Sequence, residues 1–163
     1  MKLLRLYLVL AAGIVSLTLS GCNNIKSSKK EISSLIDDYV KYSAVFFSIL
    51  NDKKKSKIIE NGDTSSLSKE ELDAANRYLR LFAEQTAYES TTAKMIWFGN
   101  IVGYQIKNIN IYGNKAIAVI QARAKSALKF SDTPDEYKFI FHLRYVASKW
   151  RIQSIEAAKP ISS

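Results

Sequence analysis

Apolar side chains recur at a helical spacing in the earlier part of this chain and at a strand-like spacing in the later part. From Ile32 to Leu50 the apolar positions come every three or four residues, which predicts one amphipathic helix of about 20 residues. Ser28 and Glu31 are three residues apart and fit a capping box at the start of this helix. The lysine-rich segment 53–61 is compatible with a short second helix that ends before a glycine.

A further helical pattern begins after the polar loop 63–68. Ser68 and Glu71 form a second capping box, and apolar residues at helical spacing continue from there to Thr86. The pattern allows this helix to run, with a break, as far as Phe98, where Gly99 stops it. At least two helices are therefore expected before the first strand.

Beyond Gly99 the apolar residues alternate with polar ones. We expect strands at residues 104–111, 115–129, 137–147 and 150–155, with turns at Gly113-Asn114, at 131–136 and at Ser148-Lys149. Helices followed by an antiparallel meander predict an α+β fold, in which the N-terminal helices pack on a curved antiparallel sheet of about four strands.

The residues before the first helix have the order of a secretory signal. Lys2 and Arg5 precede an uncharged run from Leu6 to Leu19. As a helix, these 14 residues would measure about 21 Å, against about 30 Å for the hydrocarbon core of a bilayer. The run is thus too short to span comfortably, and we expect it to be removed.

Small residues lead to the one cysteine of the chain, and Leu19-Ser20-Gly21-Cys22 resembles a bacterial lipobox. The resemblance implies cleavage between Gly21 and Cys22 and a diacylglycerol thioether on Cys22, whose two acyl chains would anchor stably. The alternative is an ordinary signal peptide followed by a chance cysteine. The implied location is the extracytoplasmic face of the cell membrane, with the outer membrane allowed because Asn23 is not aspartate.

These boundaries divide the chain into four parts. We expect a signal peptide at residues 1–21, a lipidated tether at 22–30, one α+β domain at 31–157 and a flexible tail at 158–163. Eight extended tether residues, 23–30, would reach at most about 26–29 Å. Because the chain holds one cysteine, no intramolecular disulfide is expected, and the exported domain must be stable through its core alone.

Two stretches resemble the nuclear transport factor 2-like (cystatin-like) superfamily. They are the hairpin Ile109-Asn110-Ile111-Tyr112-Gly113-Asn114-Lys115-Ala116-Ile117-Ala118-Val119 and the closing strand Lys149-Trp150-Arg151-Ile152-Gln153-Ser154-Ile155. The resemblance covers about residues 30–157. This chain departs from a typical member of the superfamily because it lacks a clear early strand between the helices. It implies a cone with an apolar pocket between helix and sheet, in a family of enzymes, transport adaptors and binding modules. Fold alone therefore does not choose a function.

Candidate chemistry is sparse. His142 is the one histidine, and the adjacent acid pairs Asp37-Asp38 and Glu70-Glu71 point about 100° apart on their helices. We therefore predict no catalytic residue, no metal site and no cofactor besides the lipid on Cys22. The aromatic residues are interpreted as core, with a ligand pocket as the alternative, and its candidate lining residues are Tyr39, Phe82, Tyr104, Phe141 and Trp150.

The excess positive charge lies in the sheet half. Residues 22–89 carry 11 basic and 11 acidic side chains, whereas residues 90–163 carry 11 basic and 4 acidic ones. Strand alternation predicts a basic partner face that consists of Arg123, Lys125, His142, Arg144 and Arg151, shared with apolar Ile117, Val119, Ile140, Val146 and Ile155. The alternative is an ordinary solvated face.

Three functions remain open from the sequence. The first is a membrane-anchored, non-enzymatic binding or assembly module, whose sheet face meets a protein partner, another copy or an anionic envelope polymer. The second is a pocket protein for a small apolar ligand or, less favoured, an isomerase-like enzyme. The third is a component of type IV secretion or conjugation. Nucleic acid is not an expected partner, because the lipid would place the domain outside the cytoplasm.

Overall fold

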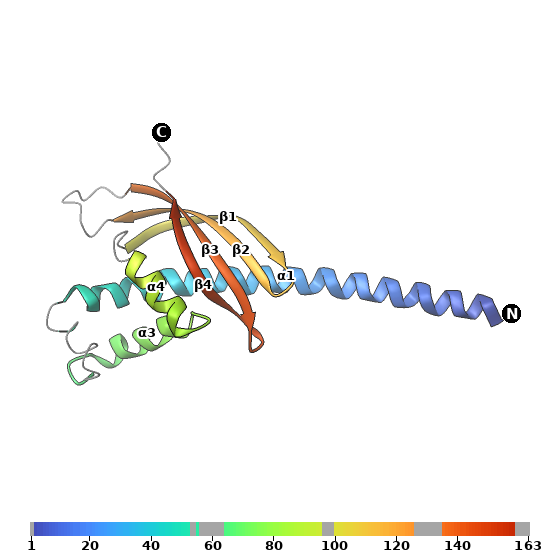
Figure 1. The fold of residues 1–163 in the computed structure, drawn as a ribbon, viewed down its shortest axis with the longest axis horizontal. Helices are drawn as coiled ribbons and strands as arrows, with labels where there is room; N and C mark the ends of the chain where they lie inside the picture. Colours follow the sequence, from blue (N-terminus) through green and yellow to red (C-terminus); the bar gives the residue numbers. More distant parts are fainter. Residues whose placement is uncertain (1, 53–54, 56–63, 96–99, 126–134, 159–163) are drawn as a thin grey trace.

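The computed structural model describes residues 2–52, 55, 64–95, 100–125 and 135–158, with the side chains of the first helix from Asn24 onward (Figure 1). In these residues three helices precede a four-stranded sheet, so the predicted α+β class is confirmed. The helices and strands are α1 (Lys2–Asn51), α3 (Lys69–Leu79), α4 (Gln85–Met95), β1 (Asn100–Tyr112), β2 (Lys115–Lys125), β3 (Asp135–Val146) and β4 (Lys149–Ala158). The strands pair in the order β1-β2-β3-β4, and every pairing is antiparallel.

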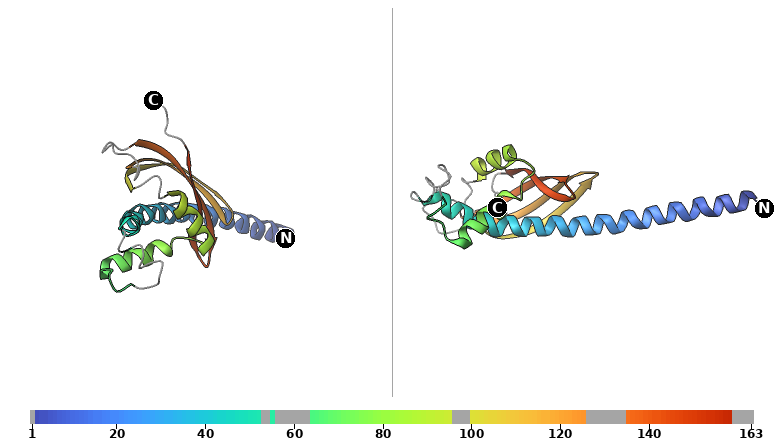
Figure 2. Two further views of the ribbon diagram at one scale, coloured as in Figure 1. Left: turned by 60° about the vertical axis from the view of Figure 1, so that its left-hand side comes forward. Right: turned by 90° about the horizontal axis from the view of Figure 1, so that it is seen from below.

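The sheet is twisted and curves around the C-terminal half of α1, while the N-terminal part of α1 projects beyond the strands (Figures 1 and 2). Helix α3 packs beside α1, and α4 lies against β4. No helix among the described residues is long and apolar enough to cross a membrane.

The core lies between α1 and one face of the sheet. Ile32, Ile36 and Tyr39 are fully buried on α1 at the predicted helical spacing. Small residues on β2 lie directly opposite large ones on β3, as in the pairs Ala118–Phe141 and Ala122–Tyr137. This pairing of small with large side chains lets the two strands fill the core without voids or overlap. The burial along β2 alternates strictly, because successive residues of a strand face opposite sides.

Helix α1 does not begin at Ser28, so that prediction is wrong. The helix runs unbroken through residues 22–30, where the sequence suggested a tether. Residues 23–30 contain neither proline nor glycine, and lysine and serine do not stop a helix. Glu31, the expected capping partner of Ser28, instead accepts a hydrogen bond from the Trp150 backbone N–H at 3.1 Å. Eight helical residues span only about 12 Å, less than half the length of an extended tether.

The second capping box is present. The Glu71 N–H donates to Ser68 Oγ at 3.1 Å, and the Ser68 N–H donates to Glu71 Oε2 at 2.9 Å. These bonds satisfy two backbone donors that the helix start would otherwise leave unpaired. Sequence pattern alone therefore located the start of α3 correctly.

The predicted break in the second helical pattern occurs between α3 and α4, where the chain bonds to the edge of β4. The Ala83 N–H donates to the Ile152 carbonyl, and the Ile152 N–H donates to the Leu81 carbonyl, both at 2.8 Å. Phe82 thus forms a one-residue parallel bridge with Ile152. The bridge covers part of a strand edge that would otherwise be open to pairing.

Element ends differ from the predictions by a few residues. β1 begins four residues earlier than expected, and the β3–β4 turn consists of Ala147 and Ser148 rather than Ser148 and Lys149. Both turn residues have positive φ, a conformation usually taken by Asn-Gly, so the sequence offered no signal for this position. The predicted short helix at 53–61 lies, apart from Lys55, outside the described residues, as do the end of the predicted second strand at 126–129 and the tail beyond Ala158.

Candidate binding face and its grooves

The side of the sheet away from α1 is called the outer face. On β2 and β3 its side chains are exposed or half-buried, in contrast to the buried residues that alternate with them. Three apolar side chains, Ile117, Val119 and Ile140, lie next to one another here because Val119 pairs with Ile140 across the strands. The outer-face residues of β2 and β3 are Lys115, Ile117, Val119, Gln121, Arg123, Glu136, Lys138, Ile140, His142 and Arg144.

A β-bulge on β4 changes which residues reach this face. His142 pairs with Ser154 and Leu143 pairs with Ile152, so Gln153 is an extra residue with no partner on β3. Regular alternation would place Ile155 on the same face as Arg151, as the sequence suggested. The bulge instead turns Ile155 into the core, where it is 1% exposed, and the placement of Ile155 on the basic face is wrong.

The structure divides the predicted basic partner face into two ends. Arg123 and Lys125 lie near one end of β2, and Arg123 pairs with Glu136 on β3. Arg144 and Arg151 lie at the other end, opposite the start of β2. Eight residues of strand, about 26 Å, separate Arg123 from the start of β2. The five predicted residues therefore do not form one basic patch.

A basic row crosses three strands at the end that holds Arg144. Lys115 on β2 lies directly opposite Arg144 on β3, and Arg144 lies directly opposite Arg151 on β4. Arg151 also donates to the Arg80 carbonyl, in the segment that joins α3 to α4. Like charges directly opposite in a sheet repel one another, so this row does not stabilise the strand pairing.

An open groove of about 700 Å³ lies where the start of α4 meets the sheet, and we call it the outer groove. The outer face contributes Ile117 and His142, and the bulge contributes Gln153 and Ser154. The complete lining consists of Glu84, Thr86, Ala87, Ser90, Tyr112, Lys115, Ala116, Ile117, His142, Leu143, Gln153 and Ser154. Its size is within the range of ligand sites, and it combines apolar side chains with hydroxyl, amide and charged groups.

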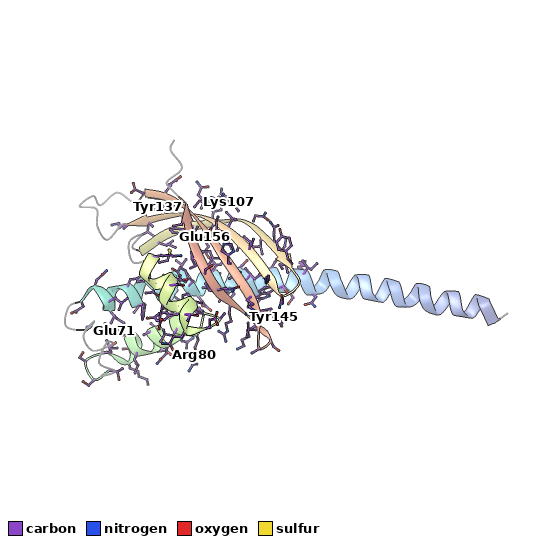
Figure 3. All side chains as sticks on the ribbon, in the orientation of Figure 1. Glu71, Arg80, Lys107, Tyr137, Tyr145 and Glu156 are labelled. Atoms are coloured by element: carbon purple, nitrogen blue, oxygen red, sulfur yellow. The ribbon has the colours of Figure 1, made fainter. Side chains whose placement is uncertain are left out.

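His142 is the residue of the predicted set that lies in this groove. Its Nε2 atom is buried and lies 3.1 Å from Glu156 Oε1, an ion-pair distance without the alignment of a hydrogen bond. Glu156 itself is exposed, and Figure 3 labels it on the upper part of the sheet. A histidine paired with an exposed carboxylate suits polar recognition at the groove wall.

The five candidate pocket residues do not line one cavity. Tyr39 and Phe141 contact each other edge to face at 5.3 Å between ring centroids, and both are fully buried. Phe82 contacts Tyr78 within an aromatic cluster, at 5.2 Å between centroids. Tyr104 and Trp150 lie at two separate surface grooves. Tyr39, Phe82, Phe141 and Trp150 are core residues, and the five side chains do not surround one ligand site.

The buried tyrosines are not poised for proton transfer. Burial, and secondarily the neighbouring Tyr78, raises the pKa of Tyr39 well above its ordinary value. Burial likewise raises the pKa of Tyr78 to about 12. Tyr104 donates a hydrogen bond to Asp37, and burial together with this carboxylate raises the pKa of Tyr104. All three hydroxyls therefore stay protonated at neutral pH, and the Tyr104 bond ties β1 to α1.

Within the described part of the chain, no group of three or more His, Cys, Asp or Glu side chains is placed to hold a metal ion. The sequence did not reveal the residues of α4 that border the outer groove, such as Thr86 and Ser90. Their contribution depends on how α4 packs against β4, and neither periodicity nor charge along the chain carries that information.

No protein-family model matches this chain, and no curated protein matches it. Among solved structures it is similar to an NTF-2 like protein of unknown function from Shewanella oneidensis MR-1, at 13% sequence identity and a TM-score of 0.45. The likeness covers 79% of this chain and 97% of that one. At this identity and TM-score it assigns neither a family nor a function to the chain.

Proposed function

We propose that this chain is a lipid-anchored, extracytoplasmic binding module without catalytic activity, and that the outer groove receives a segment of a protein partner. The observation that carries the proposal is the groove itself. It is open and about 700 Å³ in volume, and it combines the apolar Ile117 with polar groups at His142, Ser154 and Ser90. Interfaces of this kind place an apolar centre inside a polar rim.

The anchor is the second half of the proposal. Leu19-Ser20-Gly21-Cys22 has the residues and flanks of a lipobox, and the basic start and short apolar run precede it. Cleavage before Cys22 would remove the part of α1 that precedes this residue. The mature chain would then begin with the lipidated residue, ten positions before Ile32, the first buried residue among the described side chains of α1.

The anchor is tested with Cys22→Ser. We expect the wild-type chain to incorporate labelled palmitate and to sediment with membranes, and Cys22→Ser to lose the label and to appear in the soluble extract. The two acyl chains are what binds the wild-type chain stably to the bilayer, so release of Cys22→Ser should be nearly complete after a high-salt wash. Ser20→Ala is the matched control, since a small residue remains before the cleavage site. Membrane retention of Cys22→Ser after a high-salt wash would contradict the anchor.

The groove is tested by photo-crosslinking from Gln153, which is exposed and lines it. A photoreactive residue at position 153 should form one discrete protein adduct in intact cells, and Ile117→Glu should reduce it at least tenfold. Introducing a charge at the apolar centre opposes burial of that centre by any partner. Gln105→Glu, on exposed β1 away from the outer groove, should leave the adduct unchanged. Equal adduct formation with Ile117→Glu and Gln105→Glu would exclude the groove as the binding site.

A small-molecule ligand is the second candidate, because the volume of the groove lies within the range of ligand sites of about 300–1,000 Å³. Native mass spectrometry of the chain purified from its own membranes distinguishes the two. A bound small molecule that Ile117→Glu displaces, with no protein adduct from position 153, would favour the ligand over the protein partner.

A further inference from the structure

Both tight hairpin turns of the sheet lie at one end, since β1–β2 and β3–β4 each turn there, while the last described residues of β2 and the first of β3 lie at the opposite end. We call this the hairpin end and define it by residues 112–115 and 144–149. In Figure 1 it lies beside the point where α1 leaves the sheet, and Figure 3 labels Tyr145 there.

Helix α1 contacts the hairpin end just after Cys22. A groove of about 400 Å³, the hairpin groove, is lined by Asn24, Ile25, Ser28, Ile111, Gly113, Tyr145 and Trp150. Helix α1 continues without interruption from Cys22 to Ile25, and three residues advance only about 4.5 Å along a helix. A lipid on Cys22 therefore brings the hairpin end to the membrane surface, an outcome that an extended tether would not enforce.

Exposed apolar side chains gather at this same end. Of the six large hydrophobic residues that are exposed in the described chain, four lie at or beside the hairpin end: Ile25, Tyr112, Tyr145 and Val146, at 51%, 62%, 43% and 36% exposure. Tyrosine prefers the membrane–water interface, where its ring is apolar and its hydroxyl remains hydrated. Trp150 is 4% exposed, and its buried indole N–H has no hydrogen-bond partner among the described residues.

The charge at the hairpin end is positive. Lys26, Lys115, Arg144 and Lys149 are exposed there, and Lys115, Arg144 and Arg151 form the unfavourable basic row across the strands. Residues 111–118 and 141–152 contain neither Asp nor Glu. Two carboxylates border the region: Glu31, which accepts from the Trp150 N–H, and Glu84, which lines the outer groove with Lys115. An anionic surface would relieve the repulsion within the row.

We propose that the hairpin end is a membrane-binding surface that contacts the anionic headgroups of the bilayer in which the anchor sits. This inference rests on the proposed lipidation for its geometry, and on the basic and aromatic side chains for its chemistry. Tyr112 and Tyr145 lie at the interface, and Lys115, Arg144 and Lys149 contact lipid phosphates. The domain is then held in one orientation, with the β2–β3 end directed away from the membrane.

The test uses the lipidated chain in vesicles with an environment-sensitive fluorophore on Ser148→Cys, at the turn of the hairpin end. A thioether on Cys22 leaves the new cysteine as the one free thiol. On vesicles of phosphatidylcholine with 30% phosphatidylglycerol, iodide should quench this fluorophore at least fivefold less than on pure phosphatidylcholine. Ser66→Cys, exposed in the loop before α3, should show no such difference, because α3 begins at the opposite end of the domain (Figure 1).

The variant Lys115→Glu/Arg144→Glu/Lys149→Glu should restore quenching at position 148 while the chain stays on the vesicles. Unfolding of this variant is checked by its melting temperature, which should not fall, because positions 144 and 151 become oppositely charged while positions 115 and 144 stay like-charged, as in the wild type. A fluorophore at 148 that is equally quenched on both vesicle types would overturn the inference. Protection in cells but not on pure vesicles would do the same, because a protein would then cover the surface.

A second arm separates this inference from the proposed anchor. Cys22→Ser should still bind vesicles with 30% phosphatidylglycerol weakly, and 0.5 M salt should release it. The triple variant in the Cys22→Ser background should bind at least tenfold less tightly, because each basic residue near an anionic surface strengthens binding about fivefold. Failure to find lipid on Cys22 would remove the anchor but leave this binding. Absence of binding by Cys22→Ser, with an intact anchor in the wild type, would remove the hairpin surface alone.

Discussion

Deletion of Ile140 is expected to abolish folding, whereas deletion of Gln153 is expected to lower the free energy of unfolding by less than about 2 kcal/mol. Both changes remove one residue from a strand, but they act on different pairings. Ile140 lies in a regular stretch of β3, where losing one residue reverses the faces of everything on one side of the deletion. Either Tyr137 and Phe139 or Phe141 and Leu143 then turn out of the core.

The cost of the Ile140 deletion exceeds what a small domain can sustain. Each large apolar side chain that leaves the core loses about 1.5–3 kcal/mol, and a charged residue such as Lys138 or Arg144 would take a buried position. A domain of this size has a total stability of about 5–15 kcal/mol. The deletion should therefore give no cooperative urea transition and no dispersed amide spectrum.

Gln153 behaves differently because it is the extra residue of the bulge. Without it, Ser154 alone separates Ile152 from Ile155, so the two isoleucines are two positions apart on a regular strand and both remain on the core face. The expected loss is confined to local twist and to the wall of the outer groove. This loss in the free energy of unfolding is measured by urea unfolding of the Gln153 deletion, with Gln153→Ala as the comparison. A collapse as complete as that of the Ile140 deletion would show that the bulge assignment is wrong.

Phe141→Ala is expected to lower the free energy of unfolding by about 3–5 kcal/mol. Phe141 is fully buried, lies opposite Ala118 on β2 and contacts the Tyr39 ring edge to face. Alanine at 141 would leave a cavity between two strands and α1 that Ala118 is too small to fill. Urea denaturation, followed by tryptophan fluorescence in the Cys22→Ser background, gives the change directly.

Ile140→Ala is the matched control, one residue earlier on the same strand. Its side chain is half-buried on the outer face, outside the core, so we expect a loss below about 1.5 kcal/mol. Both variants place alanine in the same strand, so a change in strand propensity lowers the free energy of unfolding of both similarly. The difference between them reports which face of β3 is altered. Equal losses for the two would mean that the outer face is covered as fully as the core, and would contradict the open binding face.

Local patterns predicted most elements of this fold correctly. The Ser68 capping box, the hairpin turn at Gly113 and the alternating core residues of β2 and β3 are all properties of a few neighbouring residues. Each involves a short-range bond or a fixed period that the sequence displays directly. The start of α1 was missed because Ser28 and Glu31 have the sequence spacing of a capping box, and the same spacing also occurs inside a continuous helix.

The bulge at Gln153 and the split of the basic face were not accessible to the sequence. Alternation assigns a face to each residue only within an uninterrupted ladder, and the register shift between His142 and Leu143 is set by pairing with another strand. The outer groove depends equally on the packing of α4 against β4.

The sequence by itself determined the fold class, the core positions of the helices and central strands, and the candidate anchor at Cys22, because periodicity and short motifs are local. Only the tertiary structure decided that Arg123 lies far from Arg144, that Ile155 is buried, and that Asn24 and Ile25 of α1 line one groove with Tyr145. These relations join residues that are far apart in the chain. Strand register and helix packing set them through contacts that no single segment encodes.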